Sequence, residues 1–223
     1  MGTLYVVGTP IGNLEDITLR AVRILKEVDF IICEDTRWTQ KLLNHYSIKK
    51  PLTSYHQHSK IKQVDQIIAK LKNSQAALVS DAGTPGIADP GNKLVKEALA
   101  KGIKVEVVPG PSALIVLLSI SGLPTDKFEF LGFLPHKKGR AKLFQKIKTA
   151  DHLIIFYESP HRILKTLQSL AETLSDDQPV VVGRELTKVF EEVIRGSAKQ
   201  VLKYFTDNQD KVKGEFTVIV NSS

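Results

Sequence analysis

Two short polar stretches, each following an apolar run, carry the groups best suited to chemistry. They are "EDTR" at residues 34–37 and "RELTK" at residues 184–188, and both combine carboxylates with cations. A lysine with a depressed pKa could act as a base, and an arginine could position a phosphate. Asp35, Arg37, Glu185 and Lys188 are therefore our candidate catalytic residues. The alternative is an ion-pair network that pins two domains together.

Three loops rich in glycine and proline also follow apolar runs. They are "GTPIGN" (8–13), "SDAGTPGIADPG" (80–91) and "PGPSA" (109–113). Glycine lets a ligand approach the backbone closely, and proline fixes the shape of a loop. Because ligands of open α/β sheets bind at the carboxyl ends of the strands, the three loops predict a pocket made largely of main chain.

The loop at 80–91 does not match the known phosphate-binding patterns. Counted from Gly86, the Walker pattern would need a lysine where Asn92 stands and a hydroxyl where Lys93 stands. The first loop lacks the G-x-G-x-x-G order of dinucleotide sites. Asp81 and Asp89 are too few for a calcium loop and are typical of turns and caps.

A metal site has little support elsewhere in the sequence. His56 and His58 would share one face of a strand, which suits zinc, but no third ligand is evident and exposed polar histidines are the alternative. We predict no metal. Cys33, the single cysteine, lies among apolar residues and reads as a buried structural side chain.

These loops belong to an alternation of strand and helix patterns in the first half of the chain. Expected strands cover 3–8, 29–34, 52–55, 76–80 and 104–110, and expected helices cover 17–28, 36–46, 60–72, 93–102 and 112–122. Asp16 is available to cap the first helix, whose apolar positions include Leu19 and Val22. The alternation predicts a mostly parallel sheet covered by helices on both faces.

A Gly/Pro turn cluster at 121–126 precedes a second half of different order. Strands are expected in "KFEFLGFLP", "HLIIFYES", "PVVVGREL", "KVFEEVIRG" and "GEFTVIV", with helices at 140–148 and 162–174. Two consecutive strands without a helix between them predict a mixed sheet. We expect two α/β domains, residues 1–118 and 119–223.

Composition limits the class of protein and its partners. The 223 residues carry a net charge of +7 and a pI near 9.3, which favours polyanions such as nucleic acid. No run of about 18 apolar residues and no signal-like N-terminus is readable, so we expect a cytoplasmic protein without a membrane span.

Eight motifs in a fixed order closely resemble one known family. They are "GTPIGNLEDITLRA", "EDTR", "SDAGTPGIADPG", "VPGPSA", "FEFLGFLP", "FYESPHR", "GRELTK" and "KGEF". Together they resemble the ribosomal RNA small-subunit 2′-O-methyltransferase I family, a branch of the tetrapyrrole methylase superfamily. The resemblance extends from Thr3 to about Val220.

The resemblance implies an S-adenosylmethionine-dependent homodimer with two α/β domains and the cofactor in the cleft between them. The implied reaction methylates the ribose 2′-hydroxyl of a cytidine in the decoding region of 16S ribosomal RNA, free or in the small ribosomal subunit. Matched to the family's motifs, the cofactor-binding residues are Pro10, Ala82, Gly83, Thr84, Ile87, Ser112, Ala113, Tyr157, Glu158 and the backbone at Leu186.

A basic segment in the second half is the candidate RNA contact. Lys137, Lys138 and Arg140 share a glycine-containing turn that suits backbone phosphates, and we add Arg162 of the "FYESPHR" motif. Tyr157, Phe133 and His161 could stack a base. A small-molecule methylase of the tetrapyrrole type and a non-catalytic RNA-binding assembly factor are the alternative functions.

Overall fold

The computed structural model describes residues 2–56, 61–137 and 139–221. The chain divides into two compact units, residues 1–112 and 113–223, and each is described by itself. The boundary that the sequence suggested, after residue 118, falls inside a helix that belongs to the second unit.

The first unit is a five-stranded parallel sheet with the strand order β3-β2-β4-β1-β5. Its strands are β1 (Thr3–Val7), β2 (Phe30–Cys33), β3 (Leu52–Ser54), β4 (Ala76–Leu78) and β5 (Lys104–Val108). Its helices are η1 (Leu14–Asp16), α1 (Leu19–Glu27), α2 (Thr36–His45), α3 (Ile61–Leu71) and α4 (Asn92–Ala100). The prediction of a parallel sheet for the first half is confirmed.

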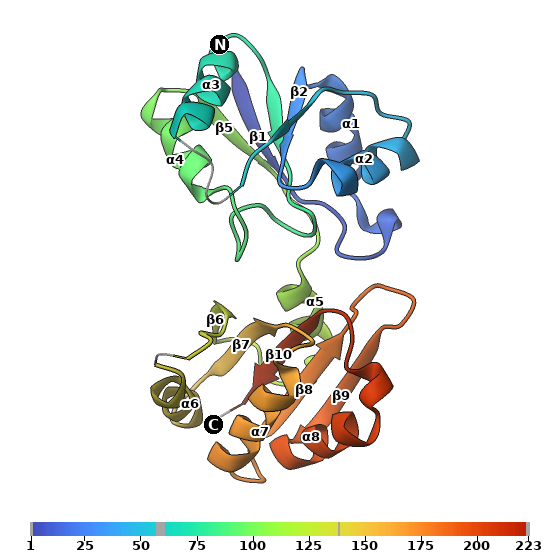
Figure 1. Cartoon of the computed structure of the whole chain (residues 1–223), viewed down its shortest axis with the longest axis vertical. Coiled ribbons are helices and arrows are strands. Elements are labelled where there is room, and N and C mark those ends of the chain that lie inside the picture. Colours follow the sequence, from blue (N-terminus) through green and yellow to red (C-terminus); the bar gives the residue numbers. More distant parts are fainter. Residues whose placement is uncertain (1, 57–60, 138, 222–223) are drawn as a thin grey trace. The chain divides into compact units, whose positions relative to one another are not determined.

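Helices cover both faces of this sheet (Figure 1). One hydrophobic cluster joins the sheet to α1 and α2 through residues such as Ile24, Leu25 and Leu43. A second cluster joins the opposite face to α3 and α4 through residues such as Ile67 and Leu94. Since all five strands are parallel, their carboxyl ends and the loops that follow them lie along one edge.

The second unit is a mixed sheet with the strand order β6-β7-β10-β8-β9. Its strands are β6 (Phe128–Phe133), β7 (Leu153–Glu158), β8 (Pro179–Arg184), β9 (Glu192–Ser197) and β10 (Phe216–Val220). Only β6 and β7 pair in parallel, and β10 runs antiparallel to both of its neighbours. The predicted mixed sheet is confirmed.

The helices of this unit are α5 (Ala113–Ser121), α6 (Arg140–Lys148), α7 (Ile163–Thr173), α8 (Ala198–Asp207) and η2 (Gln209–Lys211). A single cluster packs α6, α7 and α8 against one face, with Phe156, Phe205 and Phe216 fully buried. Helix α5 lies on the other face, where a Cβ on Gly183 would come within 2.8 Å of Leu117. The lack of a side chain at Gly183 therefore lets this helix approach the sheet.

Two details of the helices differ from the sequence prediction. Thr18, not Asp16, caps α1 by accepting a hydrogen bond from the Ala21 amide, and Leu19 is exposed. Helix α8 was not expected, although Ser197 and Gln200 form a capping box and Val201 and Phe205 share its buried face. Short strands on either side of that segment obscured a helical pattern of only ten residues.

Candidate functional site

Two of the glycine-rich loops are joined at the carboxyl edge of the first sheet. Thr9 and Gly83 exchange both backbone hydrogen bonds, at 2.9 and 3.1 Å. The Thr9 hydroxyl donates to the carbonyl of Ser80 at 3.2 Å. The loop after β1 and the loop after β4 are therefore held together by main chain.

The third loop meets the first through a contact between two glycines. A Cβ added to Gly8 would lie 2.7 Å from the Cα of Gly110, so neither position has room for a side chain. The Gly8 amide donates to the Val108 carbonyl at 2.9 Å. The three loops thus form one continuous rim.

Gly83 is the central residue of this rim. Its φ of +77° lies in the left-handed region that favours glycine. A Cβ there would point between Ile11 and the Pro111 carbonyl, whose atoms would lie 3.5 and 3.7 Å away. The space above Gly83 is therefore bounded by residues of all three loops, which is the geometry that close backbone approach by a ligand requires.

The other predicted cofactor residues of the first unit lie along the same rim. Ala82 and Ile87 are exposed, Thr84 and Ser112 are half-buried, and Pro10 is buried. Ala113, half-buried, begins α5 of the second unit. The residues of the first unit are thus brought to one edge.

Carboxylates from two loops gather beside this rim. The Asp81 carboxylate accepts a hydrogen bond from the Asp35 amide at 3.1 Å. Burial, followed by the charges of Glu34 and Asp81, raises the pKa of Asp89 to about 7. Burial also raises the pKa of Asp81. Among the described residues, no group of three His, Cys, Asp or Glu side chains could hold a metal ion.

Asp35 and Arg37, two of the candidate catalytic residues, form an ion pair at the start of α2. The Arg37 guanidinium donates to both carboxylate oxygens of Asp35, at 3.0 Å from Nε and 2.6 Å from Nη2. Asp35 also accepts from the Arg37 amide and caps the helix. These hydrogen bonds lower the pKa of Asp35 to about 2, so its carboxylate is a weak base.

A cavity of about 440 Å³ opens next to this ion pair, and we call it the edge cavity. Its lining comes from the last residue of β3 and from residues that follow β2, β3 and β4, namely Glu34, Asp35, Thr36, Arg37, Ser54, His56 and Asp81. Within it the Ser54 hydroxyl lies 2.9 Å from His56 Nε2. Ser54 was missed by sequence reasoning, and its place directly at a strand end was the available signal. His58, which the sequence analysis considered together with His56, lies outside the described residues.

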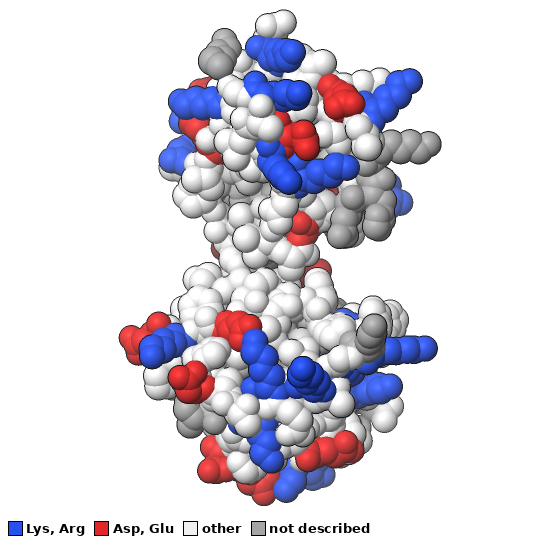
Figure 2. Space-filling view, turned by 90° about the vertical axis from the view of Figure 1, so that its left-hand side faces the viewer, with Lys and Arg blue, Asp and Glu red and all other residues white. Residues whose placement is uncertain are grey.

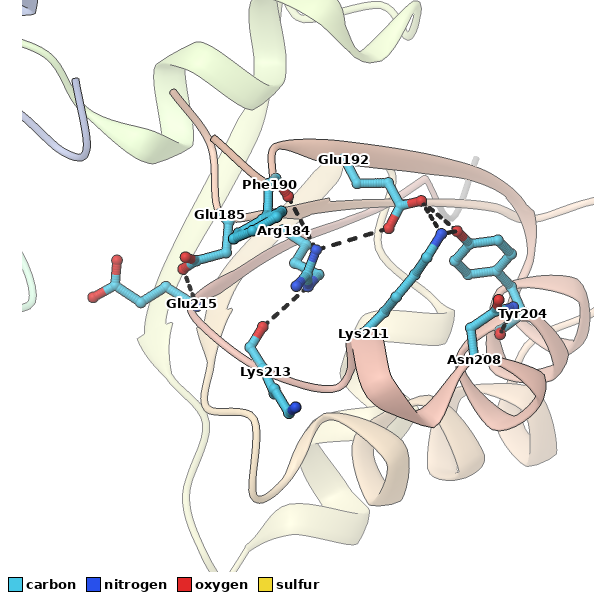
Figure 3. Close-up of polar contacts among 9 residues, drawn as sticks. All are labelled: Arg184, Glu185, Phe190, Glu192, Tyr204, Asn208, Lys211, Lys213 and Glu215. Atoms are coloured by element: carbon cyan, nitrogen blue, oxygen red, sulfur yellow. Dashed lines mark hydrogen bonds and ion pairs between the residues drawn. The ribbon is translucent and has the colours of Figure 1, made fainter. Parts of the chain in front are cut away.

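Glu185 and Lys188, the other two candidate catalytic residues, belong to an ion-pair network in the second unit. Lys188 Nζ lies 2.9 Å from carboxylate oxygens of both Glu185 and Glu215. The Glu185 carboxylate also accepts from the Glu215 amide, as Figure 3 shows. Burial would lower the pKa of Lys188, but its two carboxylate partners outweigh burial and raise it. The idea of a lysine with a depressed pKa is therefore wrong for Lys188.

Arg184 is held by the same segment of the second unit. Its guanidinium donates to the carbonyl of Lys213 at 3.1 Å and to that of Phe190 at 3.0 Å, and it lies 4.0 Å from Glu192 (Figure 3). Lys211 Nζ lies 2.7 Å from the other oxygen of Glu192. These contacts fix the turn after β8 to the residues that precede β10, and they lie within the second unit rather than between two domains.

Glu158, expected from the family resemblance to contact the cofactor, is fully buried at the end of β7. One carboxylate oxygen lies 2.6 Å from Arg162 and accepts from the Ser159 amide, and the other accepts from the Thr166 hydroxyl at 2.7 Å. Both oxygens are thus engaged within the unit. Tyr157 packs edge-on against Phe130, and Leu186 is buried.

The two arginines predicted to bind RNA are turned toward this buried carboxylate. Arg162 donates to the Leu134 carbonyl at 2.8 Å, and Arg140 donates to the Thr166 hydroxyl at 2.6 Å. Lys137 is exposed, whereas Lys138 lies outside the described residues. Figure 2 shows that Lys and Arg side chains alternate with carboxylates in both units on the face in view.

Comparison with known proteins adds the following similarities. The family model described as Tetrapyrrole (Corrin/Porphyrin) Methylases matches residues 3–202. The chain is 47% identical over 222 residues to the ribosomal RNA small subunit methyltransferase I of Thermotoga maritima, covering 99% of both chains. It is 48% identical over 222 residues to the protein of the same name from Synechocystis, covering 99% of this chain and 79% of that protein.

Two solved structures share the fold at low sequence identity. The uroporphyrin-III-C-methyltransferase of Thermus thermophilus superposes with a TM-score of 0.68 at 19% identity, covering 100% of this chain and 95% of that one. A diphthine synthase gives 0.76 at 14% identity, covering 98% and 89%. No helix within the described ranges is long and apolar enough to cross a membrane.

Proposed function

Because the chain belongs to the ribosomal RNA small subunit methyltransferase I family, within the tetrapyrrole methylases, we propose that it methylates the ribose 2′-oxygen of a cytidine in the decoding region of 16S ribosomal RNA. The chain is an S-adenosylmethionine-dependent methyltransferase. The continuous main-chain rim around Gly83 is the observation in the structure that most supports the proposal.

The rim fits the chemistry of this cofactor. S-adenosylmethionine has no phosphate and carries a positive sulfonium, so a site for it needs close backbone approach and no cation. The described rim offers left-handed Gly83, exposed Ala82 and Ile87, and the neighbouring carboxylates of Asp81 and Glu34. Pro10, Ala82, Gly83, Thr84 and Ile87 would hold the cofactor. Ser112, Ala113, Tyr157 and Leu186 remain predicted contacts.

Glu158 takes a different part in this proposal. Since its two oxygens are engaged by Arg162, Ser159 and Thr166, we assign it to holding the end of β7 in place rather than to direct cofactor contact. This role explains an acidic residue at 0% side-chain exposure, because a buried charge needs paired partners.

The bound cofactor supplies an electrophilic methyl group on a sulfur that leaves with the electron pair of the broken bond. The protein must bind the RNA, align the hydroxyl and exclude water. Asp35 and Arg37 act as a pair in binding the RNA, because an exposed guanidinium held by a carboxylate can position a phosphate. Glu185 and Lys188 have a structural part, because their ion pairs fix the turn after β8.

Lys137 is the described residue to which we assign electrostatic RNA contact. Lys137→Glu should weaken binding of small subunits and reduce the slope of log affinity against log salt by about 1. Lys96→Glu, an exposed lysine on α4 of the first unit, is the matched control for net charge. Equal slopes for the two variants would remove Lys137 from the interface. Arg140 and Arg162 would act by holding the residues before α6.

We further assign the protein to the cytoplasm, where ribosomes are assembled, and to a homodimer, as the family resemblance implies. Sedimentation at concentrations spanning the expected dissociation range tests the dimer. A monomer at every concentration would contradict it.

The decisive experiment uses labelled S-adenosylmethionine and small ribosomal subunits that lack the modification. Label should enter the ribosomal RNA, and nuclease digestion should place it on a cytidine ribose in the decoding region. Label on a base, on another nucleotide or only in a porphyrinoid would overturn the proposed specificity. Tight binding of subunits without any transfer would instead support an assembly factor.

A further inference from the structure

The edge cavity contains a hydroxyl–imidazole pair to which no role has yet been given. Ser54 ends β3, and its Oγ lies 2.9 Å from His56 Nε2. Its carbonyl accepts a hydrogen bond from the Gln63 side chain of α3 at 2.5 Å. The strand end that carries the pair is therefore tied to a neighbouring helix.

This pair shares its cavity with the start of the proposed cofactor loop. Asp81 lines the edge cavity and directly precedes Ala82 and Gly83. A group bound in the edge cavity would thus lie beside the residues proposed to hold the methyl donor. The volume of about 440 Å³ falls in the range of small-molecule sites and is large enough for a nucleoside.

Three carboxylates face the edge cavity around the pair. Glu34 and Asp35 face the cavity from the segment after β2, and Asp81 faces it from the loop after β4. Among the described residues, Arg37 is the cation that lines the cavity, and it is held by Asp35. Asp81 and His56 interact electrostatically.

Two other groups of the cavity, Asp35 and Arg37, are less suited to accept a proton. Asp35 ionises near pH 2 because Arg37 and the Arg37 amide stabilise its carboxylate. Arg37 is a permanent cation whose pKa is raised further by Asp35. Imidazole is the side chain whose charge changes most readily near neutral pH, so it combines basicity with a proton that solvent can later remove.

We propose that Ser54 and His56 receive the proton that the acceptor hydroxyl of the RNA loses during methyl transfer. The proposal rests on the proposed function and names the acceptor side of the same site. As the ribose oxygen bonds to the methyl carbon, its proton passes to Ser54 Oγ while the Ser54 proton passes to His56 Nε2. The carbon–sulfur electron pair stays on sulfur, so a neutral thioether and an imidazolium replace the sulfonium and the neutral imidazole.

The test compares His56→Ala with His45→Ala, an exposed histidine at the end of α2 in the same unit. Single-turnover methyl transfer to small subunits is measured from about pH 6 to about pH 9, with S-adenosylmethionine saturating. His56→Ala should be slower by about 10²–10⁴-fold, and its rate should rise with pH where the wild-type rate levels off. His45→Ala should match the wild type.

Added imidazole separates proton transfer from a structural role. It should restore part of the rate of His56→Ala and leave His45→Ala unchanged, since the vacated cavity can admit the free base. Calorimetric affinity for S-adenosylmethionine should be the same in both variants. Ser54→Ala should also be slow, whereas Ser54→Thr, which keeps the hydroxyl, should recover most of the rate.

The possible outcomes separate this inference from the proposed function. An active wild type with an equally active His56→Ala variant would overturn the inference alone. A slow His56→Ala that imidazole does not rescue, with a pH profile parallel to the wild type, would assign His56 to structure and also overturn it. If Asp81→Asn alone changes the pH profile, the carboxylate is the acceptor. A wild type that transfers no label to RNA would overturn both.

Discussion

The two units use charged residues at their strand ends in opposite ways. In the first unit, the carboxyl edge exposes main chain and carboxylates, and burial, followed by the charges of Glu34 and Asp81, raises the pKa of Asp89 to about 7. In the second unit, Lys188, Arg184 and Arg162 are all matched to carboxylates or carbonyls. Apart from the paired Asp35 and Arg37, the carboxyl groups of the first unit have raised pKa values at Asp81 and Asp89, whereas the second unit matches its charges. This contrast favours a ligand site in the first unit and a scaffold role in the second.

The largest effect that would test this comparison is expected at Glu158. Glu158→Ala should destabilise the protein by about 3–5 kcal/mol, because it removes the buried carboxylate that pairs with half-buried Arg162 and accepts from the Ser159 amide and the Thr166 hydroxyl. Urea unfolding measures the change. Glu172→Ala on the exposed face of α7 is the matched control and should cost far less. A loss below about 1 kcal/mol at Glu158 would mean that the second unit does not depend on its ion pairs.

Gly83→Val should disrupt the proposed cofactor site of the first unit without unfolding that unit. A β-branched side chain at a left-handed residue, directed between Ile11 and Pro111, should reduce S-adenosylmethionine affinity at least about 100-fold, or roughly 2.7 kcal/mol. Calorimetry measures the affinity, and circular dichroism checks the fold.

Gly102→Val is the control for backbone strain in that experiment. Gly102 has a similar φ of +69°, but an added Cβ would meet no atom within 4 Å. It should therefore bear the same strain without changing cofactor affinity. Normal affinity in Gly83→Val, or equal losses in both variants, would refute our placement of the cofactor.

Asp89→Asn should have the smallest effect, and its sign depends on pH. Because the folded protein raises the Asp89 pKa to about 7 while an unfolded chain ionises near 4, the folded state binds the extra proton between those values. Stability therefore falls as pH rises through that window. The neutral amide should raise the melting temperature by about 2–4 °C at pH 8 and not near pH 4.

Asp65→Asn, an exposed position on α3, is the control for removal of a negative charge. Its melting temperature should follow that of the wild type at both pH values. A gain at Asp89 that is independent of pH would show that the carboxyl is not protonated in the folded protein.

The features that the sequence predicted correctly depend on residues that lie close together along the chain. Glycine loops after apolar strands located the rim, and alternation of elements predicted both sheets. Thr18 rather than Asp16 caps α1, because Asp16 is the last residue of η1 (Leu14–Asp16). The sequence pattern did not distinguish these two candidate caps. The missed helix α8 had a readable signal in Ser197 and Gln200.

Features that depend on distant residues were not predictable in the same way. The pKa of Lys188 is raised partly by Glu215, 27 positions later, so the "RELTK" motif alone gave the wrong direction. Arg140 looked like a phosphate ligand because nothing in its turn reveals Thr166, 26 positions later. The partner of Arg162 was nearer, since Glu158 stands four positions before it in the "FYESPHR" motif. Tertiary partners decide whether a charge is available to a ligand.

The contact between Gly8 and Gly110 restricts how this rim could be redesigned or could diverge. Each glycine is already the smallest residue, so an added methyl group at one has no compensating reduction at the other. The segments after β1 and β5 consequently cannot be exchanged singly for loops that carry a side chain at the crossing. A graft that alters substrate preference would have to replace both loops together or leave both glycines in place.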